Sequence, residues 1–151
     1  MNRLWLPFAL VHLSLSGIWL GAMAYSLGVV QPRVARFFPE PRRREEFLTV
    51  LAHGNRRPVV ALLAALVAAG VVVLLSSPGA VVTTGYAVAL GLDLAAGAVF
   101  WHVSWRHWPA RVFALPAELP GYQARLRRLA WSMLLLVGAG FGVALAASLW
   151  R

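Results

Sequence analysis

Asp93 is the residue whose type and position most strongly indicate chemistry. It lies near the middle of a long apolar segment and is flanked by GLDLAAG. A carboxylate at the centre of a membrane helix costs about 2.5–3.5 kcal/mol on insertion scales, so it needs a partner or a purpose. The residue alone allows two interpretations. One is a structural, hydrogen-bonded Asp; the other is a site for a proton, a metal or a ligand.

His12 is the expected partner of Asp93. It lies in another apolar segment at a comparable depth, and a His–Asp pair would lower the cost of burying both side chains. Tyr86 precedes Asp93 by seven residues, which places it about 20° away around a helix, facing the same interior. We therefore expect His12 and Asp93 to lie within about 8 Å of each other, or to be bridged, because inward-facing side chains can nearly meet even across the ~13–14 Å between diagonal helix axes. The alternative is that His12 bonds to a backbone carbonyl or a serine.

Four other residues are candidates for binding a cofactor. His53 and His102 could ligate a haem iron or another metal, while Arg56 and Arg57 hold haem propionates. His12 and Met23 are the candidate ligands for a metal such as copper. The competing interpretation is that His, Trp and Arg near the end of a membrane helix are ordinary interfacial anchors. The sequence contains no Cys, which excludes thiolate catalysis and thiolate metal sites, and nothing in it positively indicates an enzyme.

Four apolar segments must position these residues. The chain is 60% hydrophobic and only 13% charged, far from the balance of a soluble domain. Each segment approaches or exceeds the length of about 20 helical residues that crosses a bilayer, and none alternates as a barrel strand would. The sequence therefore predicts an all-α fold, a four-helix bundle forming one transmembrane domain over 1–151. Its helices are expected at about 4–30, 58–75, 80–103 and 129–150.

Arginine placement predicts the orientation of this bundle. Two loops carry twelve of the fourteen arginines, and no Lys is present. Cytoplasmic loops are the ones enriched in basic residues, so both termini are expected outside and both loops in the cytoplasm. This indicates a multi-pass protein of the inner (cytoplasmic) membrane with anionic lipid headgroups as partners, and not a nucleic-acid-binding protein. The loop arginines are Arg33, Arg36, Arg42, Arg43, Arg44, Arg56, Arg57, Arg106, Arg111, Arg125, Arg127 and Arg128.

The first of these loops contains a further expected helix. Pro41 to Gly54 reads PRRREEFLTVLAHG, with apolar residues at helical spacing beside an arginine-rich start. This pattern predicts a helix over about 41–54 that lies along the membrane surface, and a new helix beginning at Pro58.

The first helix and its loop resemble a known family. His12 to Gly21 reads HLSLSGIWLG, a His followed after six residues by Trp-x-Gly; GVVQPRVARFF and FLTVLAHGNRRPVVALLAALVAAG follow it. Over residues 8 to 70 this pattern resembles the copper-resistance-D-like membrane proteins and the related haem-associated protoporphyrinogen oxidase type. The resemblance implies a four-helix membrane protein that handles copper or haem b, with His12 in the place of the first-helix His. The haem-associated enzymes also use a lysine, which this sequence lacks.

Three functions are consistent with these observations. The first is a bundle that binds haem or copper, in metal or haem handling or in electron transfer. The second is a non-catalytic accessory or assembly subunit that docks into a larger membrane complex or forms a homo-oligomer. The third is a small proton-coupled transporter whose coupling residue is Asp93.

Overall fold

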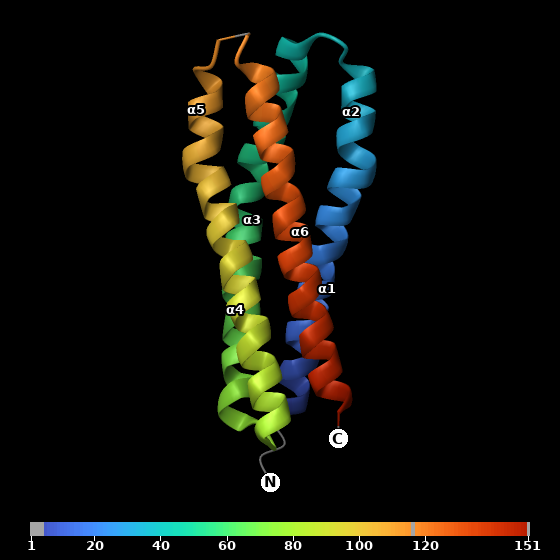
Figure 1. Cartoon of the computed structure of the whole chain (residues 1–151), viewed down its shortest axis with the longest axis vertical. Helices are drawn as coiled ribbons and strands as arrows, with labels where there is room; N and C mark the ends of the chain where they lie inside the picture. Colours follow the sequence, from blue (N-terminus) through green and yellow to red (C-terminus); the bar gives the residue numbers. More distant parts are fainter. Residues whose placement is uncertain (1–4, 116, 151) are drawn as a thin grey trace.

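The chain folds into four long helices that run along one axis (Figure 1). The structure is a computed structural model and describes residues 5–115 and 117–150. The helices cover Trp5–Phe37, Arg42–Ser76, Ala80–Ala110 and Leu119–Leu149, and each is long and apolar enough to cross a membrane. No strand occurs within the described ranges. The predicted all-α fold with four helices is therefore confirmed.

The first helix is longer than the predicted 4–30. It consists of α1 (Trp5–Tyr25), a π-helical segment η1 (Ser26–Val30) and α2 (Gln31–Phe37), which follow one another without a break. Pro32 lies in the first turn of α2, where its missing N–H leaves no hydrogen bond unmade. The wider π turn before it shifts the hydrogen-bond register, and the helix continues past the proline.

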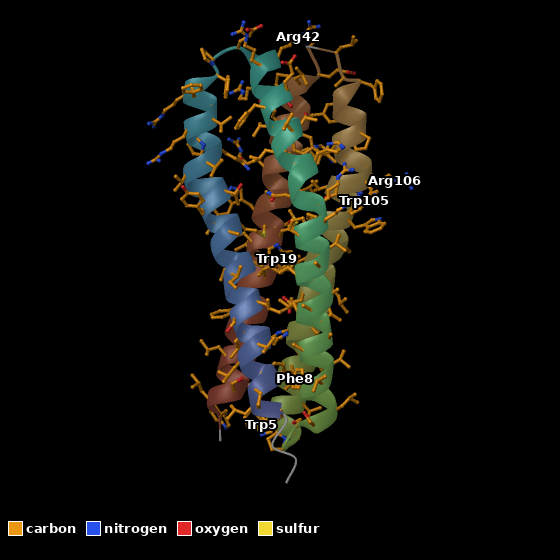
Figure 2. The ribbon with its side chains drawn as sticks, turned by 180° about the vertical axis from the view of Figure 1, so that it is seen from behind. Trp5, Phe8, Trp19, Arg42, Trp105 and Arg106 are labelled. Carbon is orange, nitrogen blue, oxygen red and sulfur yellow. The ribbon has the colours of Figure 1, made fainter. Side chains whose placement is uncertain are left out.

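The second helix corrects the prediction of a separate helix lying along the membrane surface. Residues 41–54 are helical, but they belong to one unbroken helix, α3 (Pro41–Ser76), which also contains the predicted 58–75 segment and Pro58. Figure 2 shows Arg42 at the far end of this helix, on the same axis as the rest of it. A single proline removes one backbone hydrogen bond and can kink a helix without ending it.

The third and fourth helices also extend past their predicted limits of 103 and 129. α4 (Ala80–His102) continues through the π-helical η2 (Val103–His107) into α5 (Trp108–Val112), and α6 begins at Leu119 and ends at Leu149. Pro120 lies in the first turn of α6, where a proline is well tolerated. The segment between the predicted third and fourth helices is therefore helical over 104–112 and again from 119.

The four helices alternate in direction around the bundle. α1 packs against α3 and α6, and α4 packs against the same two helices. α1 and α4 therefore run in the same direction and occupy diagonally opposite positions in the bundle. A contact between them must cross the bundle centre. Figure 1 shows both termini at one end. We call this the terminal end, and the opposite end, where α2, α5 and the arginine-rich connections lie, the loop end.

Two buried apolar clusters fill the interior. The cluster nearer the terminal end draws on all four helices and consists of Ala9, Val73, Val82, Tyr86, Ala89, Ala144 and Ala147. The second lies toward the loop end and consists of Trp19, Ala96 and Val137. Figure 2 shows Trp19 at mid-height, between Trp5 at one end and Arg42 at the other. The level between these clusters holds the central polar groups.

Close packing of α4 against α6 depends on Gly85. A Cβ at Gly85 would lie 2.3 Å from the Cβ of Ala147, whereas a Cβ at Gly91 on the same helix would meet nothing within 4 Å. We predict that Gly85→Ala lowers the free energy of unfolding by about 1–3 kcal/mol, the usual cost of overpacking. Gly91→Ala should be neutral or slightly stabilising. Reversible unfolding in mixed detergent micelles measures both; equal effects would show that the α4–α6 approach is not tight.

Candidate functional site

His12 is fully buried on α1 and is held by α3. Its Nδ1 lies 3.1 Å from the backbone carbonyl oxygen of Leu66. A carbonyl can only accept, so Nδ1 carries the proton and donates it. Gly70 makes room for this ring, because a Cβ there would lie 3.1 Å from Nδ1 and 2.7 Å from Leu90 Cδ2. The alternative considered from the sequence, a His bonded to a carbonyl, is thus present on one side of the ring.

The other side of the His12 ring faces Asp93 on α4. Nε2 lies 3.5 Å from Asp93 Oδ2, and both side chains are 0% exposed. The expected pairing across the bundle is therefore present in the structure. Gly140 on α6 lies against the carboxyl group, since a Cβ there would be 3.1 Å from Oδ1. All four helices thus contribute to this level: α1 and α4 supply the pair, while α3 and α6 supply the Leu66 carbonyl and two glycines.

The arrangement of the pair favours one shared proton. With a proton on Nδ1, a neutral His12 presents a lone pair at Nε2 to a carboxylate oxygen, and two lone pairs repel. A further proton between His12 and Asp93, on either the imidazole or the carboxyl group, removes this repulsion. Neither Nε2 nor either carboxylate oxygen has a hydrogen-bond partner among the described residues. A shift of about 0.7 Å would bring the 3.5 Å separation of Nε2 and Oδ2 to hydrogen-bond length.

Ser16 adds another unpartnered polar atom one turn away on α1. Its side chain is 0% exposed, and its Oγ has no hydrogen-bond partner within the part of the chain that the structure describes. A helical serine usually donates to the carbonyl four residues earlier. Its i+4 spacing from His12 is the signal by which the sequence could have indicated it.

Tyr86 packs beside His12 and connects this level to the terminal end. The two ring centroids are 5.3 Å apart, and the Tyr86 hydroxyl is 3.0 Å from Ser148 Oγ on α6. Ser148 donates its own proton to the carbonyl of Ala144 at 2.8 Å, so Tyr86 is the donor in the first bond. The sequence placed Tyr86 correctly on the inner face but gave no indication of Ser148.

The residues predicted to hold haem or copper are not brought together. His53, His102 and Arg57 are exposed. Met23 is eleven residues beyond His12 on the same helix, about 16 Å along its axis. No group of three or more His, Cys, Asp or Glu among the described residues could hold a metal ion.

The environment of His12 also does not suit a metal ligand. One ring nitrogen donates to Leu66 and the other faces Asp93. Coordination through Nε2 would require breaking the buried pair. The donor set of His12 therefore does not fit haem or copper.

Arg56 has a structural role instead of holding propionates. It is half-buried on α3 and donates to the carbonyl of Ser104 in η2. Its guanidinium also lies 5.5 Å from the centroid of the Trp105 ring. π-helical turns leave carbonyls poorly paired, and this arginine supplies a donor to one of them.

His107 is a further buried histidine, at the loop end of the bundle. It is 3% exposed, and its Nε2 donates to the backbone carbonyl of Tyr122 at 3.2 Å. On the same part of α6, the Gln123 amide donates to Glu45 Oε1 at 2.7 Å. The π-helical η2 turns His107 inward, and no sequence pattern predicted that segment.

Comparisons with family models, with curated proteins and with solved structures find no match to this chain.

Proposed function

We propose that the chain spans the cell membrane four times, with both termini outside and the loop end in the cytoplasm. The helices have 31 to 35 residues, about 46–52 Å, which exceeds a hydrocarbon core of about 30 Å. Trp5 and Trp101 mark the two borders of that core, because about 30 Å of α4 separates Ala80 near the terminal end from Trp101. The remaining helix then extends into the cytoplasm and carries the arginines. Outward apolar residues such as Ile18, Leu94 and Leu135, which are 56–69% exposed, would face lipid.

This topology predicts the location of both termini. Reporters fused to either end should give an external signal, because twelve of the fourteen arginines lie in segments at the loop end and basic segments stay in the cytoplasm. Alkaline phosphatase, active only outside, and green fluorescent protein, bright only inside, give opposite signals at each fusion point. A fluorescent, phosphatase-inactive C-terminal fusion would contradict the topology.

We further propose that the protein is a small proton-coupled transporter in which the His12–Asp93 pair binds and releases the proton. The observation that supports this is the unsatisfied geometry of the pair. Buried polar groups with a purely structural role normally have their donors and acceptors satisfied. Here Nε2 and both carboxylate oxygens lack hydrogen-bond partners among the described residues, and so does the nearby Ser16 hydroxyl.

Each residue has a distinct role in this proposal. Asp93 gains and loses the proton, because it is the acid at the centre of the bundle. His12 stays fixed by its bond to Leu66, and its Nε2 is placed to accept a hydrogen bond from the protonated carboxyl group. Ser16 lies one turn toward the loop end and adds a buried hydroxyl without a hydrogen-bond partner among the described residues.

Proton flux into proteoliposomes tests the proposal. A potassium diffusion potential drives protons inward, and a trapped pH-sensitive dye reports them. We expect flux with the wild-type protein and none above protein-free vesicles with Asp93→Asn, because an amide of equal size cannot exchange the proton. Glu46→Gln is the matched control, since it makes the same chemical change at an exposed carboxylate. Wild-type flux in Asp93→Asn would refute the proposal and favour an assembly subunit.

A further inference from the structure

The outer face of α4 and η2 carries two tryptophans that stack on each other near the loop end. The centroids of the Trp101 and Trp105 rings are 4.0 Å apart, and the angle between the ring planes is 14°. Their side chains are 58% and 37% exposed. Ala98 and Leu94 are also exposed and continue this face toward the terminal end at helical spacing. These four residues form an apolar strip on the outside of the bundle.

Two arginines lie at the loop-end limit of the strip. The Arg56 guanidinium on α3 is 5.5 Å from the centroid of the Trp105 ring, and it donates to the carbonyl of Ser104. That bond uses one of the five N–H donors of a guanidinium. Arg106 follows Trp105 in η2, and Figure 2 shows both side chains projecting outward from this part of the helix. The strip therefore ends at a group of cationic donors.

The positive charge of these two arginines is not neutralised by the chain. Neither arginine takes part in a salt bridge among the described residues. On α3 the acid closest to Arg56 is Glu46, ten residues away, about 15 Å along the axis. The sequence from 47 to 117 contains one acid, Asp93, which is buried at the centre of the bundle. The loop-end limit of the strip therefore favours an anion.

The proposed topology places this group in the headgroup layer of the cytoplasmic leaflet. Trp101 marks the border of the hydrocarbon core, and Trp105 lies one helical turn beyond it, about 6 Å. The headgroup layer on each side of a bilayer has a similar thickness, since the full membrane is about 40–45 Å thick and its core about 30 Å. Lipid phosphates therefore lie at the height of the arginines, and acyl chains at the height of the strip.

We propose that this face binds one anionic phospholipid. Its phosphate accepts hydrogen bonds from Arg56 and Arg106, and one acyl chain lies along Trp105, Trp101 and Ala98. This inference rests on the proposed topology. The fork of an arginine matches the oxygens of a phosphate, and basic sites at the cytoplasmic side of membrane helices bind anionic headgroups. A zwitterionic lipid would bring its own cation beside the two arginines, so the site discriminates against it.

Quenching of tryptophan fluorescence by brominated lipid tests the site. The full chain is reconstituted in phosphatidylcholine vesicles with increasing fractions of phosphatidylglycerol that carries bromine near the glycerol end of one acyl chain. We expect half-maximal quenching at a fraction about tenfold lower than with brominated phosphatidylcholine, which corresponds to 1.4 kcal/mol of preference. The chain has seven tryptophans, so the double variant Trp101→Phe, Trp105→Phe should lose the quenching at low fractions. Its persistence in that variant would overturn the site.

Two arginine variants assign the phosphate contact. Arg106→Gln should raise the fraction for half-maximal quenching about tenfold, the factor expected when one charged hydrogen bond is lost. Arg36→Gln, at an exposed arginine of α2, is the matched control and should leave it unchanged. Equal shifts in both variants, or equal quenching by the two lipids, would overturn the site. Recovery of fluorescence on adding inorganic phosphate would overturn the lipid as its occupant. The fused reporters test the topology separately, so each of these results leaves the proposed function intact.

Discussion

His12→Leu is expected to lower the free energy of unfolding by about 3–5 kcal/mol, the cost of removing one partner from a buried charge pair. The reason is specific to the geometry. Asp93 is 0% exposed, and His12 is the residue that faces its carboxyl oxygens with a nitrogen, at 3.5 Å. Without that nitrogen the carboxyl group remains buried among apolar atoms and Gly140, with no side chain to share its proton.

The double variant His12→Leu, Asp93→Leu should recover most of this loss, because replacing both members of a buried pair by apolar residues is often close to neutral. The two single variants and the double variant form a cycle in which we expect a coupling energy of about 2 kcal/mol or more, as for residues in one network. Equilibrium unfolding in mixed micelles measures each corner. His102→Leu, at an exposed histidine, is the control and should change stability by less than about 0.5 kcal/mol. Additive losses would show that the two side chains do not interact.

Trp19→Ala is expected to produce the second large effect. Trp19 is 4% exposed and is the largest side chain of the buried cluster it forms with Ala96 and Val137. Truncating a buried Trp to Ala costs about 3–5 kcal/mol through lost contacts and the cavity left behind. The same truncation opens the layer between the His12–Asp93 pair and the loop end, so the passive proton leak of proteoliposomes should rise.

Ile18→Ala is the matched control for this experiment. Ile18 is the adjacent residue and is 60% exposed, on the outer face of the bundle. It should cause little change in either stability or leak. A destabilised Trp19→Ala protein whose leak equals that of the wild type would show that Trp19 only packs and does not seal the bundle.

The fold was largely predictable, and the errors concern where helices begin and end. Apolar runs of spanning length indicated four helices, but the predicted helices ended where the apolar runs ended, and Pro58 was taken as the start of a helix. The structure places Pro32 and Pro120 in first turns and Pro58 inside α3. A sequence shows where a proline lacks its backbone N–H. It does not show whether the helix needs a hydrogen bond from that position. Helix ends in this chain therefore could not be located from proline alone.

The central pair could be predicted because depth along a helix follows from counting residues. The residues that surround the pair could not be predicted in this way. The contacts of His12 with Leu66 and of Tyr86 with Ser148 depend on how each helix is rotated and how closely the backbones approach, which is decided at glycines such as Gly70 and Gly140. The same limitation explains why His53 and His102 were predicted as haem ligands. Their side chains have suitable chemistry, but the sequence does not show that both are exposed.

The central claim is that Asp93 binds and releases a proton inside the bundle, and the infrared titration of the purified protein tests it most directly. Difference spectra are recorded over the pH range in which the protein stays folded, for the wild type, Asp93→Asn and the exposed-site control Glu46→Gln. We expect a carboxylic acid C=O band that appears and disappears with pH in the wild type and in Glu46→Gln, and that is missing in Asp93→Asn. Identical spectra for the wild type and Asp93→Asn at every pH would contradict the account, because Asp93 would then hold one protonation state and could not carry a proton.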